Sequence, residues 1–173
     1  RYGFISVTSE NRMAILDLKE FKLLRSVPVG SQPHRPMSTG DGRYVLVPNA
    51  GSHSLSILST LTFHAIATVP VGIAATEVNT GYLDTVAFVS AEGEGILAKV
   101  DLTNFSEAGQ IRLSGAPGSA IVTSDSRRLI AALQGTSEIA VVDAGTQELS
   151  RVLNAHVTGL QDVSIGVSNN ICH

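Results

Sequence analysis

The chain is poor in the residues and segments that carry several common functions. Cys172 is the single cysteine among 173 residues, which excludes an internal disulfide framework. Tryptophan is absent, and the 12 Lys and Arg residues form no basic run beside 15 Asp and Glu residues. Nucleic-acid surfaces need clustered basic side chains, so we expect no nucleic-acid partner. No apolar stretch reaches the roughly 18 to 20 residues that span a bilayer, so we expect no membrane-spanning segment.

The residues that are abundant point to one all-β domain. Hydrophobic residues make up 43% of the chain and charged residues 16%, with 16 glycines. The hydrophobic part is rich in Val and Ile, and Thr and Ser are frequent, which favours strands over helices. No segment keeps a 3.6-residue apolar period for two turns, so we expect no regular helix. The length fits a single domain, residues 1–173.

An internal repeat runs along the chain. Tyr2 to Gly30 reads YGFISVTSENRMAILDLKEFKLLRSVPVG, and Tyr44 to Gly72, 42 residues later, reads YVLVPNAGSHSLSILSTLTFHAIATVPVG. Both copies end in Val-Pro-Val-Gly, and the third and fourth copies keep the same register less closely. A repeat of this length indicates a repeat architecture. The expected units are approximately 1–32, 33–74, 75–116 and 117–159, with 160–173 as a closing inner strand.

Each unit holds four short apolar runs separated by Gly, Asn, Ser, Thr or Asp. In the second unit these runs are 37–39, 44–47, 54–58 and 64–69. Their alternation predicts strands, and Gly-rich stretches between them supply the left-handed backbone positions that tight hairpins need. Four antiparallel strands per repeat of this length predict a β-propeller blade. The expected fold class is therefore all-β, a β-propeller with about four 42-residue repeats in this chain.

The second unit carries a family resemblance. The run RYVLVPNAGSHSLSILSTLTFHAIATVPVG at 43–72 resembles the YVTN repeat, in which a Tyr-Val-x-Val-x-Asn strand leads to a Ser-Val-Ile-Asp strand. The segment PHRPMSTGDGRY at 33–44 is similar to the link that begins the next blade of such repeats. This resemblance implies an exported propeller, periplasmic, extracellular or in a surface layer, with a binding or scaffold role.

The order of the strands leaves the closure of the ring open. The chain begins on what reads as the second strand of a blade, 2–7, and ends on what reads as an inner strand, 162–167. The last strand could complete the first blade and close a four-bladed ring. Alternatively, the chain is part of a seven- or eight-bladed ring, or two chains pair. Its first residue is Arg1 rather than Met, which would fit a removed signal peptide or missing upstream sequence.

The entrances of the inner strands are the expected ligand-binding positions, because they line the central channel of a propeller. In register these positions are His34 and Arg35, Thr76 and Glu77, Gly118 and Ser119, and Leu160 and Gln161. His34, Arg35 and Glu77 are the candidates for binding a small ligand in the channel, since they could hold an anion, a metal or the acidic groups of a cofactor. A channel mouth lined by solvated polar residues is the simpler alternative.

Two further groups of residues have the chemistry of possible sites. Cys172 and His173 could ligate copper or zinc, although a haem-attachment Cys-x-x-Cys-His motif is incomplete because Asn169 stands at its first cysteine. A free thiol is the alternative there. Asp17, Asp101 and Asp143 recur once per unit, so we expect them to cap turns by accepting backbone N–H bonds. The remaining histidines, at 53, 64 and 156, are expected to be surface residues.

These observations favour a non-catalytic binding or scaffold propeller whose partner is a protein or further blades. The alternative is the propeller subunit of a periplasmic redox enzyme that uses haem, copper or a quinone cofactor. That class would need channel-facing His or Arg residues on several blades, and His34 and Arg35 supply them on one. A glycoside or lactone hydrolase would need paired carboxylates or metal ligands, which Glu77 alone does not provide.

Overall fold

The computed structural model describes residues 1–81, 83–157, 159–160 and 163–164. These residues form fifteen strands in four antiparallel sheets, one of three strands and three of four. The first sheet consists of β1 (Tyr2–Val7), β2 (Arg12–Asp17) and β3 (Lys22–Pro28). The second consists of β4 (Met37–Ser38), β5 (Tyr44–Asn49), β6 (Ser54–Ser59) and β7 (Ala65–Pro70).

The other two sheets repeat this hairpin order. The third consists of β8 (Ala75–Gly81), β9 (Val86–Ala91), β10 (Ile96–Asp101) and β11 (Ser106–Arg112). The fourth consists of β12 (Pro117–Val122), β13 (Arg128–Leu133), β14 (Glu138–Asp143) and β15 (Glu148–Asn154). Within each sheet, every strand pairs with the next one along the chain, as expected for hairpins. A single 3₁₀ turn at Thr8–Glu10 is the one helical segment of the described part of the chain.

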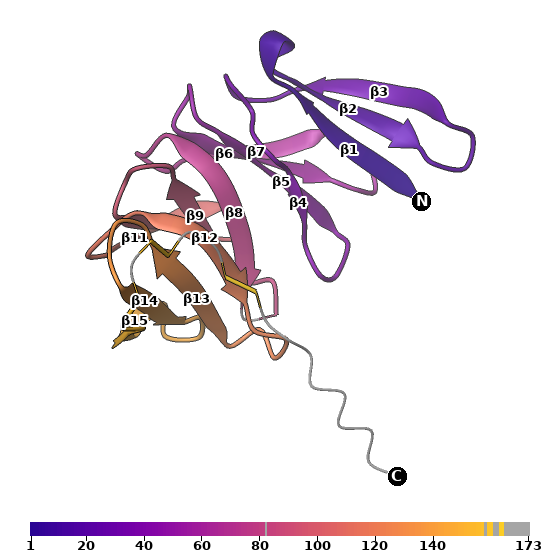
Figure 1. Ribbon diagram of the computed structural model, residues 1–173. Coiled ribbons are helices and arrows are strands. Elements are labelled where there is room, and N and C mark those ends of the chain that lie inside the picture. The colour runs from indigo at the N-terminus through magenta and orange to yellow at the C-terminus, as the bar shows by residue number, and fades with distance from the viewer. Residues whose placement is uncertain (82, 158, 161–162, 165–173) are drawn as a thin grey trace.

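The four sheets stand side by side and form an arc (Figure 1). The strands β4, β8 and β12 come first in their sheets, and β5 contacts β8 while β8 contacts β12. The first and fourth sheets lie at the two ends of the arc. The first sheet has three strands and begins at β1, the segment 2–7 that was expected to be the second strand of a blade. The closing strand expected at 162–167 falls mostly on residues outside the described part. No helix of the described residues has the length and apolar character needed to cross a bilayer.

The hydrophobic core of the described residues consists of three clusters, each lying between two consecutive sheets. Between the first and second sheets, Met13 and Ile15 pack against Val47 and Leu58, all at most 1% exposed. The other two clusters repeat this arrangement between the second and third and between the third and fourth sheets. Burying one such side chain contributes about 1.5–3 kcal/mol, so contacts between sheets are a main source of stability. A sheet therefore needs a neighbour on each apolar face.

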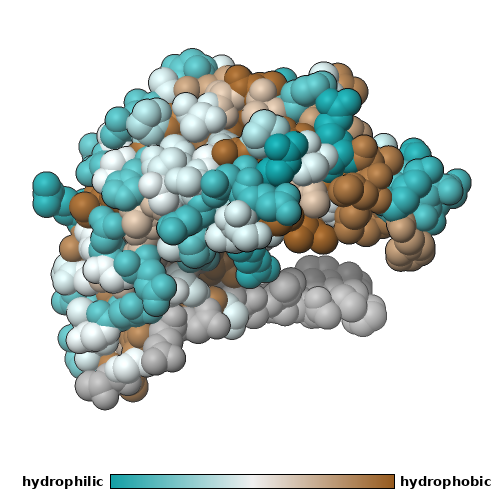
Figure 2. Space-filling model, turned by 90° about the horizontal axis from the view of Figure 1, so that it is seen from above, coloured by the Kyte–Doolittle hydropathy of each residue, from teal (hydrophilic) through white to brown (hydrophobic). Residues whose placement is uncertain are grey.

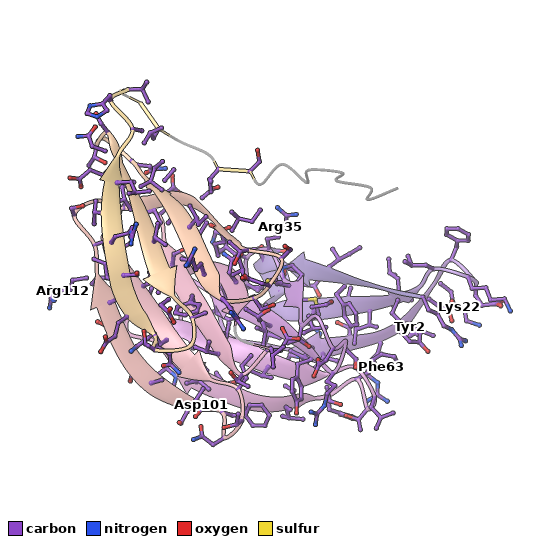
Figure 3. All side chains as sticks on the ribbon, turned by 90° about the horizontal axis from the view of Figure 1, so that it is seen from below. Tyr2, Lys22, Arg35, Phe63, Asp101 and Arg112 are labelled. Atoms are coloured by element: carbon purple, nitrogen blue, oxygen red, sulfur yellow. The ribbon has the colours of Figure 1, made fainter. Side chains whose placement is uncertain are left out.

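Aromatic pairs repeat at the outer part of the sheet interfaces. Tyr2 of β1 meets Phe63 edge-on, with ring centroids 4.9 Å apart. Tyr44 of β5 meets Phe105 in the same way at 5.4 Å. In both pairs the tyrosine begins the second strand of one blade, and the phenylalanine lies in the last hairpin turn of the next blade. Figure 3 shows Tyr2 and Phe63 close together near one end of the arc. We call this arrangement the tyrosine–phenylalanine contact.

Candidate functional site

The first strands of three sheets line one cavity on the inner side of the arc. The cavity has a volume of about 320 Å³ and receives side chains from the segment leading into β4, from β8 and from β12. Its lining residues are Arg35, Pro36, Met37, Glu77, Val78, Asn79, Ala120 and Ile121. Counting along the repeat placed Arg35 and Glu77 at neighbouring channel positions, and both do line this cavity. Figure 3 shows Arg35 on the inner side of the arc and Arg112 on the outer side.

Arg35 brings the positive charge of this cavity. It is exposed, it precedes β4, and Pro36 follows it. A proline restricts the residue before it to extended backbone, which holds this segment straight as it enters the sheet. The guanidinium group is planar and always charged, so it suits pairing with a carboxylate. The floor beside it includes Met37 and Val78, which are apolar.

His34 lies next to Arg35 but does not line the same cavity. Its backbone N–H donates to the carbonyl of Pro48 at 2.8 Å, and its carbonyl accepts a hydrogen bond from the Ser6 hydroxyl at 2.5 Å. The backbone of His34 therefore links β5 to β1, while its side chain is exposed. Of the three predicted residues, Arg35 and Glu77 therefore line one cavity, and His34 precedes Arg35 in the chain without lining it.

A second, smaller cavity adjoins the inner strands of the third and fourth sheets. It measures about 170 Å³ and is lined by Thr76, Glu77, Ser90, Glu92, Pro117, Gly118 and Gln134. Glu77 borders both cavities, and Thr76 and Gly118 are the channel positions expected from the repeat. Ser119 accepts a hydrogen bond from the backbone N–H of Val163 at 3.2 Å. The inner strands therefore present a polar surface with Glu77 at its centre.

The once-per-unit aspartates cap hairpin turns, as predicted. Asp17 accepts bonds from the N–H groups of the residues two and three positions later, at 2.8 and 3.1 Å. Asp143 does the same, with both distances 2.9 Å, and Asp101 accepts the N–H and hydroxyl of Thr103. Ser59, at the equivalent place in the second unit, accepts two longer bonds of 3.3 Å each. These carboxylates hold turns rather than a reaction centre.

The same hydrogen bonds lower the pKa of these carboxyls, because they stabilise the ionised form. The N–H of Glu20 has the largest effect on the pKa of Asp17, followed by that of Lys19. The hydroxyl of Thr103 has the largest effect on the pKa of Asp101. For Asp143 the main cause of the lowered pKa is the N–H three residues further along.

The possible metal ligands of the C-terminus fall outside the described part of the chain. Cys172 and His173 belong to the residues 165–173, so their prediction is not tested. Within the described ranges, no group of three His, Cys, Asp or Glu side chains is placed to hold one metal ion. His64 lies near the guanidinium of Arg25, with a separation of 2.6 Å between nitrogens. Since Arg only donates, the Nε2 atom of His64 accepts this bond between the first two sheets.

Sequence reasoning missed the contacts that cross from one sheet to the next. Phe63 and Phe105 stand at equivalent places of the repeat, but their contacts with Tyr2 and Tyr44 were not predicted. Asp84 was also missed: its carboxylate accepts the N–H of Asp41, in the hairpin of the preceding blade, at 2.8 Å. A signal was present, because Tyr2 and Tyr44 precede Phe63 and Phe105 by the same interval.

Comparisons with known proteins place the fold. No protein-family model matches the chain, and no curated protein matches it. Among solved structures, the hydrazine synthase of Kuenenia stuttgartiensis is similar with a TM-score of 0.75 and 23% identity, over 86% of this chain and 44% of that one. Dihydro-heme d1 dehydrogenase NirN, solved in complex with DHE, is similar with a TM-score of 0.73 and 16% identity, over 93% of this chain and 36% of that one.

These likenesses show the fold alone, because both identities lie below 25%. The chain is an all-β propeller built from antiparallel blades, as the repeat predicted. Membership of the YVTN repeat family is not shown, since no family model matches. The chain spans less than half the length of either solved chain.

Proposed function

We propose that the chain is an exported, non-catalytic propeller module that binds an acidic small ligand, or an acidic segment of a protein partner, at its channel face. The observation that carries this proposal is the cavity of about 320 Å³ where the inner strands of three blades converge. Propellers bind ligands where inner strands meet, and pockets of 300–1,000 Å³ suit small ligands. Export to the periplasm or outside the cell is part of the proposal and rests on the YVTN-like sequence of 43–72.

The chemistry of the cavity favours a ligand of mixed character. Arg35 supplies a charged donor for a carboxylate, and Met37 and Val78 supply apolar contact. Glu77 borders the same cavity and would disfavour a ligand with several negative charges. A monocarboxylate with an apolar or amine-bearing part is therefore the best match. The volume admits one group of roughly amino-acid size.

The test is a binding titration with acetate, benzoate and leucine as probes. Benzoate or leucine should bind the unaltered protein, and Arg35→Gln should weaken binding about tenfold, the loss expected for one charge-assisted hydrogen bond. Arg112→Gln is the matched control, because Arg112 is an exposed arginine on the outer strand β11. Equal affinities in all three proteins, or no binding of any probe, would contradict the proposal.

The second candidate function is a propeller subunit of a periplasmic redox enzyme. The observation that favours it is the pair of solved relatives, one a hydrazine synthase and the other a dihydro-heme d1 dehydrogenase. In that case His34, beside Arg35, would be the residue to contact haem or copper. Absorption titrations with haem and with Cu²⁺ test it. Stoichiometric binding that His34→Ala removes would support the redox role, whereas binding unaffected by this change would exclude His34 from it.

A further inference from the structure

Each later sheet packs against the preceding sheet through one apolar face, and the first sheet carries an equivalent face. In the second sheet this face is formed by Val47, Leu58 and Phe63, which pack against β2 and β3 of the first sheet. The corresponding residues 42 positions earlier are Ile5, Leu16 and Phe21. Ile5 and Leu16 lie on the side of the first sheet opposite to Met13 and Ile15, so they face away from the second sheet.

The side chains of this face are more exposed to solvent than the equivalent side chains of the second sheet. Ile5 is 50% exposed, whereas Val47 at the same position of the next blade is fully buried. Phe21 is 88% exposed, whereas Phe63 is packed against the core. Leu18, Leu23 and Leu24 of the same sheet are also 40–59% exposed. Figure 2 shows hydrophobic side chains gathered toward the end of the molecule formed by this sheet. A face this apolar marks an interaction surface.

The backbone conformation of Phe21 matches that of its equivalents in the later blades. Its φ is 49°, in the left-handed region that bulky residues rarely adopt. Phe63 and Phe105 share this conformation, with φ of 56° and 58°, and each packs edge-on against a tyrosine of the preceding blade. Gln147, at the same place in the fourth blade, also has a positive φ, of 59°, so the conformation belongs to this hairpin turn. The turn of the first sheet therefore presents Phe21 as the later turns present Phe63 and Phe105, and the described residues hold no tyrosine against it.

We propose that the outer face of the first sheet is a blade interface, covered by a further blade of the same polypeptide that precedes residue 1. This blade carries an aromatic residue at the start of its second strand, where it completes the tyrosine–phenylalanine contact on Phe21. The apolar side chains of its second and third strands cover Ile5 and Leu16, as Met13 and Ile15 cover the next sheet. This inference is independent of what the channel binds.

A second copy of the chain is a poorer occupant of the same face. It would offer the open side of its fourth sheet, where a groove of about 300 Å³ is lined in part by Arg128, Arg151 and Leu153. Arg128 stands at the position that Tyr2 and Tyr44 hold in the first and second units. Docking would place two arginines against an apolar face, so the face fits an aromatic-bearing blade better.

The test extends the chain by one of its own blades. Residues 33–74 followed by 33–42 are joined ahead of Arg1, which restores the order found before Tyr44. The probe is Ile5→Cys in a Cys172→Ser background, and its rate of reaction with a thiol reagent is measured with and without the extension. We expect the extension to slow this reaction at least tenfold. The control Leu61→Cys, in a loop of the second blade and 89% exposed, should change less than twofold.

Two outcomes would overturn the proposal. One is an unchanged reaction rate of Ile5→Cys in the extended, folded protein. The other is a two-copy particle in which Ile5→Cys is already protected without the extension, since a second copy would then be the occupant. The source of the blade is tested by the denatured mass of the natural polypeptide captured with an antibody to this chain. We expect a mass above 18.1 kDa by at least one blade, and a mass of 18.1 kDa would refute a same-chain source.

Discussion

Gly30 illustrates how a single residue determines the packing between the first and second sheets. It follows β3, and its N–H donates to the Ser56 hydroxyl at 3.2 Å. A Cβ atom at this position would lie 2.6 Å from Cγ of Asn49. The Asn49 side chain is fully buried and donates to Ser54 and Ser56 through its amide nitrogen. The polar cluster around Gly30 therefore leaves room for glycine only.

We predict that Gly30→Ala lowers the free energy of unfolding by about 1–3 kcal/mol, the usual cost of overpacking a closed site. Urea unfolding followed by circular dichroism measures it. Gly3→Ala is the matched control, because the nearest neighbour of its Cβ would be the flexible end of the Leu18 side chain, at 3.2 Å. A Gly30→Ala variant as stable as the control would show that the side chains around Gly30 can move and accept a methyl group.

The capping aspartates predict the response to acid. Hydrogen bonds lower the pKa of Asp17, Asp101 and Asp143 in the folded chain below the usual value of 3.8. A lowered folded pKa adds stability above the unfolded pKa, and this stability is lost as the pH falls through the unfolded and then the folded pKa. We therefore expect the melting temperature to drop as the pH is lowered from about 5 to 2.

Asp143→Asn should make this acid-induced drop shallower, because the amide oxygen can still accept the turn bonds but does not titrate. Melting curves between pH 7 and pH 2 measure the slope for both proteins. Glu107→Gln, on the exposed outer strand β11, controls for the loss of one negative charge. A slope identical to that of the unaltered chain would remove Asp143 from the explanation of acid sensitivity.

At the scale of the elements, aromatic contacts tie one hairpin to the next blade. Tyr44 begins β5, and Phe105 lies in the turn between β10 and β11. Arg43 lies over the Tyr44 ring at 5.4 Å, and Arg1 lies over Tyr2 at the same distance. The arginine–tyrosine pair thus repeats in two blades together with its phenylalanine partner. This repetition makes the contact a property of the repeat rather than of one site.

A double-mutant cycle on Tyr44 and Phe105 should give a coupling energy of about 0.5–1.5 kcal/mol, as expected for an edge-on aromatic pair. The measurement is urea unfolding of the unaltered chain, Tyr44→Ala, Phe105→Ala and the double variant. The matched control is the cycle on Val86 and Gln147, which hold the same two positions one blade later and contain no aromatic ring. Equal coupling in the two cycles would mean that the aromatic rings add nothing beyond packing.

The limits of sequence reasoning follow from the range of each interaction. Strands and hairpins could be predicted because alternation and turn residues act locally, as in β5 and β6. Arg35 and Glu77 could be placed on one surface because the repeat fixes their register. The separation of His34 from their cavity could not, since it depends on the direction of one side chain. The contact of Tyr2 with Phe63 was missed although the repeat carries a signal for it, because the equal spacing of tyrosine and phenylalanine does not by itself show that the two rings meet.

At the scale of the whole molecule, the arc explains both its binding surface and its open ends. The inner strands converge and form the cavity beside Arg35, whereas the outer face of the first sheet exposes apolar side chains. The first sheet exposes Phe21 and Ile5, and the fourth sheet exposes Leu153 beside a groove. Neighbouring blades bury the equivalents of Ile5 and Phe21 elsewhere in the chain, and for this reason we propose a further blade on the first sheet and a ligand on the inner side.

The most direct test of the channel-binding account is a map of amide chemical shifts during a benzoate titration. If benzoate binds in the channel, the largest shifts fall on the inner strands, at Met37, Val78 and Ile121, and Arg35→Gln removes them. Shifts concentrated on the open face of the first sheet, around Ile5 and Phe21, or shifts that survive Arg35→Gln would contradict it.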